Sequence, residues 1–451
     1  MIGAALFAMV CAVLIVLALW RYPICGLYFY FLAFYIHPPS RWWGYMLPDL
    51  RWSLLAAAVT VLALTLHRGR LTPGRASWVA TGPGLILCIF VFYLWLQLLW
   101  AVDFEEHGAA TVQYTKYILT FHLMYRLSDT PRKIWSLLGI HVAGCTFLGW
   151  LCFSAGRGGG DRLDGVGGPG IDDANTLGMM MVTGFVVGAM LFLYAKGWRR
   201  IGWVLGLPLM LNGMVLAGSR GAFLGLFGGL VVVYFLRPPK QAWVFVAAAV
   251  LGVGLGVRVV DQQFIDRMLT VKTAVKGDGP IEASAESRLF IVEAQVKMFA
   301  SYPFGAGNKG TAALSPQYLD ESLLAHGGDR VGVRSSHNTF MTFLVEQGIL
   351  GVILFVWAIL WGLGTVFQLR RLQKQGAPPE LVAPAAACCA ALAVVLVSGN
   401  FTDYLLAEVQ IWMFALLLSA LEQLRRAQPV VAPAVDGPTA GAMHGARLHP
   451  Y

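Results

Sequence analysis

Charged residues are scarce in this sequence, and their scarcity excludes a soluble protein. Only 13% of the 451 residues are Asp, Glu, Lys or Arg, whereas 57% belong to the hydrophobic set AVILMFWYC. Soluble domains carry about 25% charged residues. A chain this apolar cannot cover its own core with polar surface, so a membrane must be its solvent. The composition also excludes a disordered regulator, a coiled coil and a disulfide-stapled secreted module.

Cysteine motifs are missing as well. No CxxC pair occurs, and every cysteine lies in or beside an apolar run, so we interpret the cysteines as small apolar side chains rather than disulfides or metal ligands. The first run, Ile2–Trp20, lacks a basic leading region and a small-residue cleavage site, which favours a membrane span over a removed signal. The seven cysteines are Cys11, Cys25, Cys88, Cys145, Cys152, Cys388 and Cys389.

Long apolar runs fill most of the chain, and a membrane helix needs about 20 such residues. They predict an all-α polytopic membrane protein with about twelve transmembrane helices. This number counts the first two runs as one broken helix with the amino terminus inside; counted separately, they put the amino terminus outside. The runs are 2–20, 24–36, 52–66, 79–100, 112–127, 134–153, 174–195, 201–217, 221–236, 242–260, 348–369, 382–399 and 405–422.

The excess of basic residues is explained by topology. The 33 Lys and Arg exceed the 24 Asp and Glu by 9, and they cluster in alternate connectors, as the positive-inside rule requires of cytoplasmic loops. We therefore expect no nucleic-acid partner. The basic connectors are His67–Arg75, Arg126–Lys133, Lys196–Arg200, Arg237–Lys240, Arg370–Lys374 and Arg425–Arg426.

This topology divides the chain into four parts. The N-terminal transmembrane helices occupy 1–260, and a periplasmic loop domain with short helices occupies 261–347. The C-terminal transmembrane helices occupy 348–424, and 425–451, rich in Pro, Ala and Gly, form a disordered cytoplasmic tail. A polar stretch as long as 261–336 is usually functional or a linker, and its many aliphatic residues argue against a linker.

Two arginines on the outer side are candidates for binding an anion. Arg220 stands between glycines at the boundary of two apolar runs, where it could grip an anionic headgroup or only extend toward lipid headgroups. Arg288 lies near the start of an expected helix that ends at Ser301. The alternative for Arg288 is an ion pair with Glu286 or Glu293.

His337 is the best candidate for a general base. Ser335 or Ser336 could cap a helix that begins at His337, next to Asn338. The segment 337–369 would be about 50 Å long as one helix, against a hydrocarbon core of about 30 Å. We therefore expect Gly348 and Gly351 to divide it, which puts His337 at the membrane surface. An imidazole there can accept a proton at neutral pH. The alternative is that His337 only packs against its neighbours. Glu346 is expected to have a structural role, as a helix cap or in an ion pair.

The glycine-rich segment 156–175 is predicted to be an outer loop that could close over a polar ligand. It holds Arg157, several aspartates and Asn175 among eight glycines. No strand precedes these glycines, so they do not match a nucleotide-binding fingerprint. Its carboxylates show no metal-site spacing and no histidine joins them, so we expect no metal.

Together these residues resemble the O-antigen ligase (WaaL) family of the O-antigen ligase and polymerase superfamily, over roughly residues 50–422. The resemblance rests on Ser219-Arg220-Gly221, then Ser287-Arg288 and the turn Tyr302-Pro303-Phe304-Gly305-Ala306-Gly307. It ends with His337-Asn338 and Glu346-x-Gly348-x-x-Gly351. Pro38-Pro39, Trp42-Trp43-Gly44 and Asp173-x-Asn175 are similar to a subgroup associated with exosortase gene clusters.

The resemblance implies a GT-C-type glycosyltransferase in the Gram-negative inner membrane that works as a monomer without metal or cofactor. Such enzymes move a glycan from undecaprenyl pyrophosphate to a sugar of lipid A–core on the periplasmic face. Arg220 and Arg288 would bind the pyrophosphate, and His337 and Arg288 would act in catalysis. Arg157, Asn175, Asn338 and Glu346 would support the site, and we expect inversion at the anomeric carbon.

Two classes of alternative remain open from the sequence. The same donor would serve an O-antigen polymerase, which uses a second lipid-linked glycan as acceptor, or a ligase that glycosylates protein. A transporter of lipid-linked sugars would instead show inverted repeats and charges near the bilayer midplane. The sequence shows no such repeat, and its charges gather at the outer edge.

Overall fold

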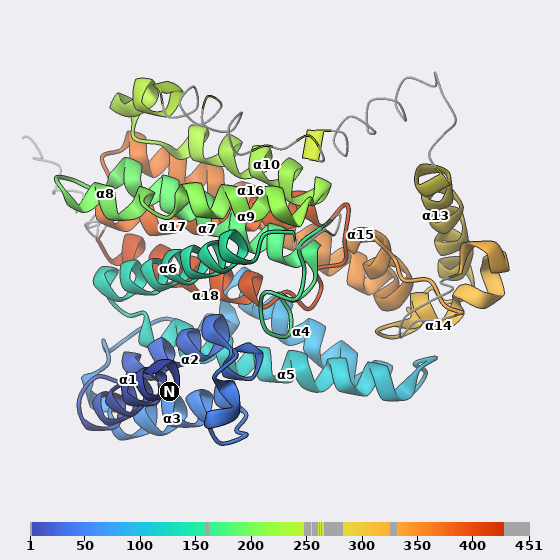
Figure 1. Ribbon diagram of the computed structural model, residues 1–451, viewed down its shortest axis with the longest axis horizontal. Coiled ribbons are helices and arrows are strands. Elements are labelled where there is room, and N and C mark those ends of the chain that lie inside the picture. The colour runs from blue at the N-terminus through green and yellow to red at the C-terminus, as the bar shows by residue number, and fades with distance from the viewer. Residues whose placement is uncertain are drawn as a thin grey trace, which may run out of the picture.

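A computed structural model describes residues 2–157, 162–247, 283–324 and 332–427, with isolated positions between 254 and 265. All the regular structure in these residues is helical (Figure 1). Within these described ranges, six helices are long and apolar enough to cross a membrane, so the protein is a polytopic membrane protein. The longer helices are α1 (Ile2–Trp20), α2 (Ile24–Ile36), α3 (Trp52–Leu66), α4 (Gly82–Gln97), α5 (Phe104–Leu127), α6 (Pro131–Ala155), α7 (Ala174–Tyr194), α9 (Leu207–Ala217), α10 (Arg220–Leu236), α13 (Ala283–Ser301), α16 (Gly348–Lys374), α17 (Pro379–Ser398) and α18 (Glu408–Ala427); the short ones are α8 (Arg199–Val204), α14 (Gly310–Tyr318) and α15 (Thr339–Thr342).

Helix α17 is the centre of the bundle, and its small side chains allow the neighbouring helices to come close. It packs against α7, α10 and α18. A Cβ built on Gly225 of α10 would lie 2.1 Å from Ser398 Oγ, and one on Gly229 would lie 2.7 Å from Val394. Small residues at such positions let two backbones approach, which is how helices associate where lipid removes the hydrophobic driving force.

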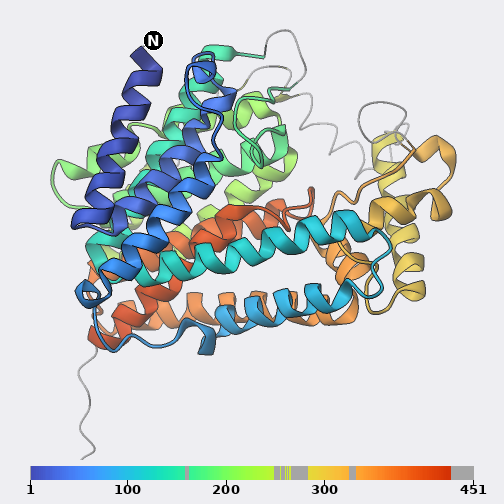
Figure 2. The same ribbon diagram turned by 90° about the horizontal axis from the view of Figure 1, so that it is seen from below.

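The first two apolar runs form two separate helices, which corrects the expected single broken helix. Helix α1 ends at Trp20 and α2 begins at Ile24, and the two pack against each other and against α3. The start of α1 lies at the same end as the 37–51 connector, since a Cβ on Gly3 would lie 2.8 Å from Trp43 Nε1. The break arises because Pro23 precedes α2 and backbone bonds close a turn at Tyr22. Together α1–α3 form a group tilted against the remaining helices (Figure 2).

The connectors gather at two opposite ends. One of these ends, called the basic end, has several connectors in contact with one another. It comprises the connectors at 21–23, 67–81, 128–130, 237–241 and 375–378 and the end of α18. Arg70 Nη1 donates to Arg21 O at 3.0 Å, and Trp135 Nε1 donates to Glu380 O at 2.9 Å. The other, the large-loop end, carries α13, α14 and α15 (Figure 1).

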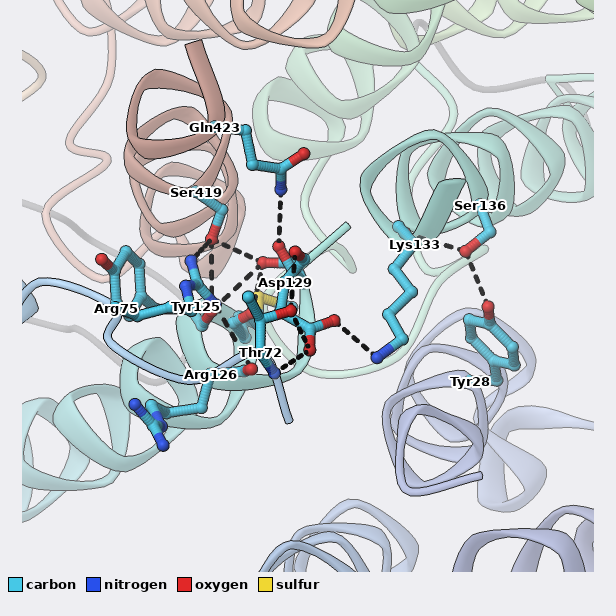
Figure 3. A network of polar contacts seen from close by, with 12 residues as sticks. Tyr28, Thr72, Arg75, Tyr125, Arg126, Asp129, Lys133, Ser136, Ser419 and Gln423 are labelled. Atoms are coloured by element: carbon cyan, nitrogen blue, oxygen red, sulfur yellow. Dashed lines mark hydrogen bonds and ion pairs between the residues drawn. The ribbon is translucent and has the colours of Figure 1, made fainter. Parts of the chain in front are cut away.

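A polar network holds the basic end together (Figure 3). The carboxylate of Asp129, between α5 and α6, accepts hydrogen bonds from Thr72 N at 2.9 Å and from Lys133 Nζ at 2.5 Å. Burial alone would raise the pKa of Asp129, but these hydrogen bonds and the Lys133 charge hold it below its ordinary value. Nearby, Ser128 Oγ and Ser419 Oγ lie 2.6 Å apart and join α5 to α18.

Candidate functional site

Arg220 is the first residue of α10 at the large-loop end. Helix α9 ends at Gly218, whose φ of 58° is the left-handed conformation that glycine favours. Ser219 then caps α10 by accepting a hydrogen bond from Ala222 N at 3.3 Å. The start of a helix has unpaired N–H groups and a partial positive charge, both of which attract anions. The Arg220 guanidinium adds its charge to that helix start.

Arg157 and Asn175, both expected to support the site, hold the turn in front of Arg220. Arg157 Nη2 donates to Val215 O at 2.9 Å, near the end of α9. Arg162 joins the same turn to α7, because its Nε donates to Ala217 O at 3.0 Å and its Nη2 donates to Asn175 Oδ1 at 2.6 Å. Arg162 therefore pairs with a carbonyl in the last turn of α9, and Arg157 adds a second hydrogen bond to Val215 O, which also accepts from Gly218 N at 3.0 Å.

The segment 398–407, between α17 and α18, is the floor on which the candidate residues meet. Asn338 Nδ2 donates to Asn400 O at 3.2 Å, and Thr339 N donates to Gly399 O at 2.7 Å. From the other side, a Cβ on Gly221, next to Arg220, would lie 3.0 Å from Phe401 Cβ. The starts of α10 and α15 thus rest on the same few residues.

The start of α7 reaches the same floor. Tyr404 Oη donates to Asn175 O at 3.0 Å, and Asp173 caps α7 by accepting from Asn175 N at 2.9 Å. A Cβ on Gly178 would lie 3.2 Å from Ser219 Cβ, so α7 also touches the turn before α10. The structure therefore brings the segments of Arg220, Asn175 and Asn338 together.

His337 lies just before α15 and is exposed. The expected cap at Ser335 or Ser336 is wrong, because Asn338 Oδ1 accepts from Met341 N at 3.1 Å and α15 begins at Thr339. Ser336 Oγ instead accepts from Asn338 N at 3.2 Å and so closes the turn around His337. The imidazole is consequently presented in a loop at the surface rather than on a helix.

Glu346 belongs to a π-helical turn, Phe343–Gln347, that joins α15 to α16. Its side chain is only 5% exposed, and its carbonyl accepts from Gln97 Nε2 at 2.7 Å and from Gly307 N at 3.0 Å. Gly348 follows with φ 62° and ψ −158° and redirects the chain into α16. The expected division falls at Gly348 alone, since Gly351 is inside α16.

The structure gives the position of the Arg288 backbone, as part of α13. It lies in the second turn of α13, and its side chain is outside the described residues. The later part of α13 buries Ala294 and Met298 against Leu314 of α14 and Val345 of the π-helical turn. This packing fixes the axis of α13 beside the turn that carries Glu346.

The turn 303–308 fastens the large loop to the bundle. Val102 N donates to Ala306 O at 2.9 Å, and Trp100 Nε1 donates to Gly305 O at 3.1 Å. Asn308 N donates to His107 Nδ1 at 2.8 Å in the interior. These bonds link the large loop to the end of α4 and the start of α5.

An apolar cavity of about 250 Å³ continues from the floor into the bundle between α4, α5, α16, α17 and α18. Thr339, Gly399, Tyr404 and Leu405 line its polar end. These four residues therefore belong both to the floor contacts and to the cavity wall. Further along, its wall is apolar and includes Leu87, Phe90, Phe343, Leu354, Phe355, Gly362, Val366, Cys389, Leu392, Ile411 and Leu417.

The connector after α2 packs on the glycine-rich segment. Arg41 Nη2 donates to Val166 O at 2.7 Å, and His37 lies so close to Gly168 that a Cβ there would be 2.4 Å from its ring. Burial, and next the Arg41 charge, lower the pKa of His37, while Asp172 acts in the opposite direction. His37 is thus neutral at physiological pH and helps fix this outer segment.

The sequence analysis did not identify the floor, residues 398–407, as part of the candidate site. Asp403, half-buried, accepts from Leu405 N at 3.0 Å and interacts electrostatically with Glu346. The signal available was a polar tetrad, Asn400-Phe401-Thr402-Asp403, between two apolar runs. Within the residues that the structure describes, no group of three or more His, Cys, Asp or Glu side chains could hold a metal ion.

Comparison with known proteins agrees with the family that the sequence resembles. A search of curated proteins returns no match. The exosortase-associated subgroup stays a prediction. Residues 205–356, from the end of α8 into α16, match the family model described as O-antigen ligase. The chain therefore carries an O-antigen ligase domain over these residues.

Proposed function

We propose that this protein is a glycosyltransferase that moves a glycan from undecaprenyl pyrophosphate to a sugar of lipid A–core. The large-loop end would face the periplasm of a Gram-negative inner membrane, and the basic end would face the cytoplasm. The bundle would have a GT-C-type architecture of about thirteen spans, one more than expected, because α1 and α2 are separate helices. Neither a metal ion nor a cofactor is part of the proposed reaction.

The continuity of the polar floor with the apolar cavity carries this proposal. A lipid-linked glycan needs a place for its pyrophosphate beside a place for its chain. Thr339, Gly399, Tyr404 and Leu405 lie where the segments bearing Arg220 and His337 meet the cavity of about 250 Å³. A soluble substrate would have no use for an apolar cavity that opens at that point.

The proposed reaction depends mainly on stabilising the negative charge of the leaving pyrophosphate. A pyrophosphate is a good leaving group, and negative charge grows on it as the sugar departs. Arg220 at the start of α10, together with Arg288 from α13, would stabilise this charge in a partly water-excluded site. Magnesium would then be unnecessary.

The acceptor hydroxyl is a weak nucleophile and needs a base. His337 would take its proton, which is worth about 10²–10⁴-fold in rate. Direct displacement would invert the anomeric carbon. Asn338, Asn175 and Glu346 would hold the surrounding segments in place through the contacts described above, and Arg157 would hold the turn before Arg220.

Complementation tests the proposal. A Gram-negative strain that lacks its ligase should regain the lipopolysaccharide ladder when it expresses the wild-type protein. His337→Ala should restore no ladder at equal membrane abundance, because the base is lost, and purified His337→Ala should lose about 10²–10⁴-fold in kcat with little change in KM.

Arg288→Ala should fail in the same strain, whereas Arg371→Ala, at the basic end, should restore the ladder and serves as the matched arginine control. Full activity of His337→Ala would refute the base assignment. A wild-type protein that makes no ladder, but extends a second lipid-linked glycan in vitro, would show a polymerase instead.

A further inference from the structure

A cavity of about 580 Å³ lies at the basic end, far from the floor and the large loop. It is formed where the turn between α1 and α2 meets the 67–75 connector and the start of α6. Nothing in the proposed reaction uses it. Its lining residues are Trp20, Arg21, Tyr22, Pro23, Ile24, Arg70, Leu71 and Lys133.

Three cations face this cavity against one carboxylate that is already neutralised. Arg21 and Arg70 are exposed, and the Lys133 side chain is 28% exposed. Among the residues that the structure describes, the acid paired with them is Asp129, which lies 2.5 Å from Lys133 Nζ and has a side chain that is 2% exposed. The cavity therefore offers a net positive charge to an anion.

The carbonyls at the end of α1 do not oppose an anion, because protein donors already occupy them. Leu17 O accepts from the backbone N–H groups of Arg21 and Tyr22 at 3.0 and 2.8 Å. Leu19 O accepts from His67 Nε2 at 2.9 Å, and Arg21 O accepts from Arg70 Nη1 at 3.0 Å. The partial negative charge that a helix end normally presents is thus largely compensated.

The cavity lies at the level of lipid headgroups. Helix α1 exposes apolar side chains along its length, among them Leu6, Met9 and Val13, as a helix facing lipid does. It ends at Trp20, 75% exposed, and Tyr22, 48% exposed. Tryptophan and tyrosine in such positions mark the membrane–water interface.

The lining is also amphipathic, which distinguishes a lipid from a soluble anion. Ile24 and Leu71 are buried at 7% exposure and line the cavity together with Pro23. An inorganic phosphate would gain nothing from these residues, whereas the glycerol and first methylenes of a phospholipid would cover them.

We propose that this cavity binds the phosphate of an anionic membrane phospholipid, with Arg21, Arg70 and Lys133 as the cationic partners. Guanidinium groups pair with phosphate through two parallel hydrogen bonds, and Lys133, whose charge Asp129 balances, adds a further N–H donor. The bound lipid would join the turn after α1 to the 67–75 connector. The site is independent of the glycosyltransferase reaction.

The test titrates short-chain phosphatidylglycerol into the purified full-length protein in an uncharged detergent, read by microscale thermophoresis. The double variant Arg21→Gln/Arg70→Gln should raise the Kd for this lipid by about tenfold or more, because two charge-assisted partners are lost. Arg68→Gln/Arg132→Gln removes the same charge from exposed positions of the same end that do not line the cavity. That control should change Kd less than about twofold.

Three results would overturn the proposal: an equal loss in the two double variants, equally tight binding of phosphatidylcholine, or displacement of the lipid by millimolar inorganic phosphate. Arg70 also holds α1, so its replacement could unfold the protein. Arg21→Gln alone keeps that contact and should still weaken phosphatidylglycerol by several-fold; an unchanged Kd in this single variant would also overturn the site.

Discussion

The apolar cavity can be blocked at one position without disturbing its walls. Gly362 of α16 lines the cavity, and a Cβ built on it meets no atom within 4 Å. In Gly362→Trp the indole should therefore extend into the space of about 250 Å³ and exclude a lipid chain from its middle. Gly364, on the same helix, also has open space around its Cβ but does not line the cavity, so Gly364→Trp is the matched control.

The expected loss is modest because the chain comes from lipid rather than from water. The hydrophobic transfer from bilayer to cavity nearly cancels, and only packing contacts are lost. Displacing one isoprene unit, whose carbons each make about two contacts of about 0.1–0.2 kcal/mol, costs about 1.5 kcal/mol. Gly362→Trp should thus raise the KM for the lipid-linked donor by about tenfold and leave kcat unchanged.

The assay measures glycan transfer by purified protein in mixed micelles over a range of donor concentrations, with thermal melting to compare folding. An unchanged KM in Gly362→Trp would refute the assignment of the cavity to the lipid chain. An equal rise in Gly364→Trp would refute it too, because the effect would then come from the surface of α16.

Three further changes test the anion position and the two ends of the bundle. Arg220→Ala should raise the donor KM by roughly 10–100-fold, the worth of a charge-assisted contact of about 1.5–3 kcal/mol, while Arg220→Lys should lose less; donor titrations measure this. Gly348→Ala should destabilise the protein by about 3 kcal/mol or more, because a Cβ would lie 2.4 Å from Pro303 O on a backbone with φ 62°; a lower melting temperature is the measurement. Asp129→Asn should cost about 1–3 kcal/mol at neutral pH. The pKa of Asp129 is lowered in the folded state, so its contribution is complete above the ordinary pKa of 3.8 and disappears as pH falls through the folded value.

A specific result would contradict each of these three predictions. Equal donor KM values for Arg220→Ala and wild type would remove Arg220 from the anion position. Gly364→Ala is the control for Gly348→Ala and should melt no lower than wild type, so equal melting of both variants would contradict the strain argument. A gap between wild type and Asp129→Asn that persists as pH falls well below the ordinary carboxyl pKa would show that hydrogen bonding rather than charge stabilises the basic end.

The sequence predicted the features that depend on neighbouring residues. Apolar run lengths located the long helices of the described residues, and Gly348 marked the point where a run too long for one span divides. The predicted boundary between two apolar runs at Arg220 exists for the same local reason, since Gly218 reaches φ 58° at no steric cost. The family resemblance rested on motifs of this local kind.

The rest depends on contacts between distant residues, which no spacing encodes. Tyr404 meets Asn175 across 229 positions of the chain, and Gln97 meets Glu346 across 249. Hydropathy left only 400–404 between two apolar runs and could not indicate that α10 and α15 both rest on the segment 398–407. The cap of α15 was misassigned because Ser336 and Asn338 are both good capping residues, and only the fold decides between them.

The fastening of residues 303–308 to α4 and α5 has a mechanical consequence. With the foot of the large loop held in place, a tilt of α13 would pivot near Ser301 and would have to loosen the packing of Ala294 and Met298. The backbone at Arg288 is 13 residues away, about 20 Å along the axis at 1.5 Å per residue. A rotation of roughly 10° would shift it by about 3 Å, the length of a hydrogen bond. On the proposed function, a small angular change at the foot would therefore decide whether Arg288 reaches the donor pyrophosphate, and the entry of a bulky glycan would be coupled to assembly of the positive charge around it.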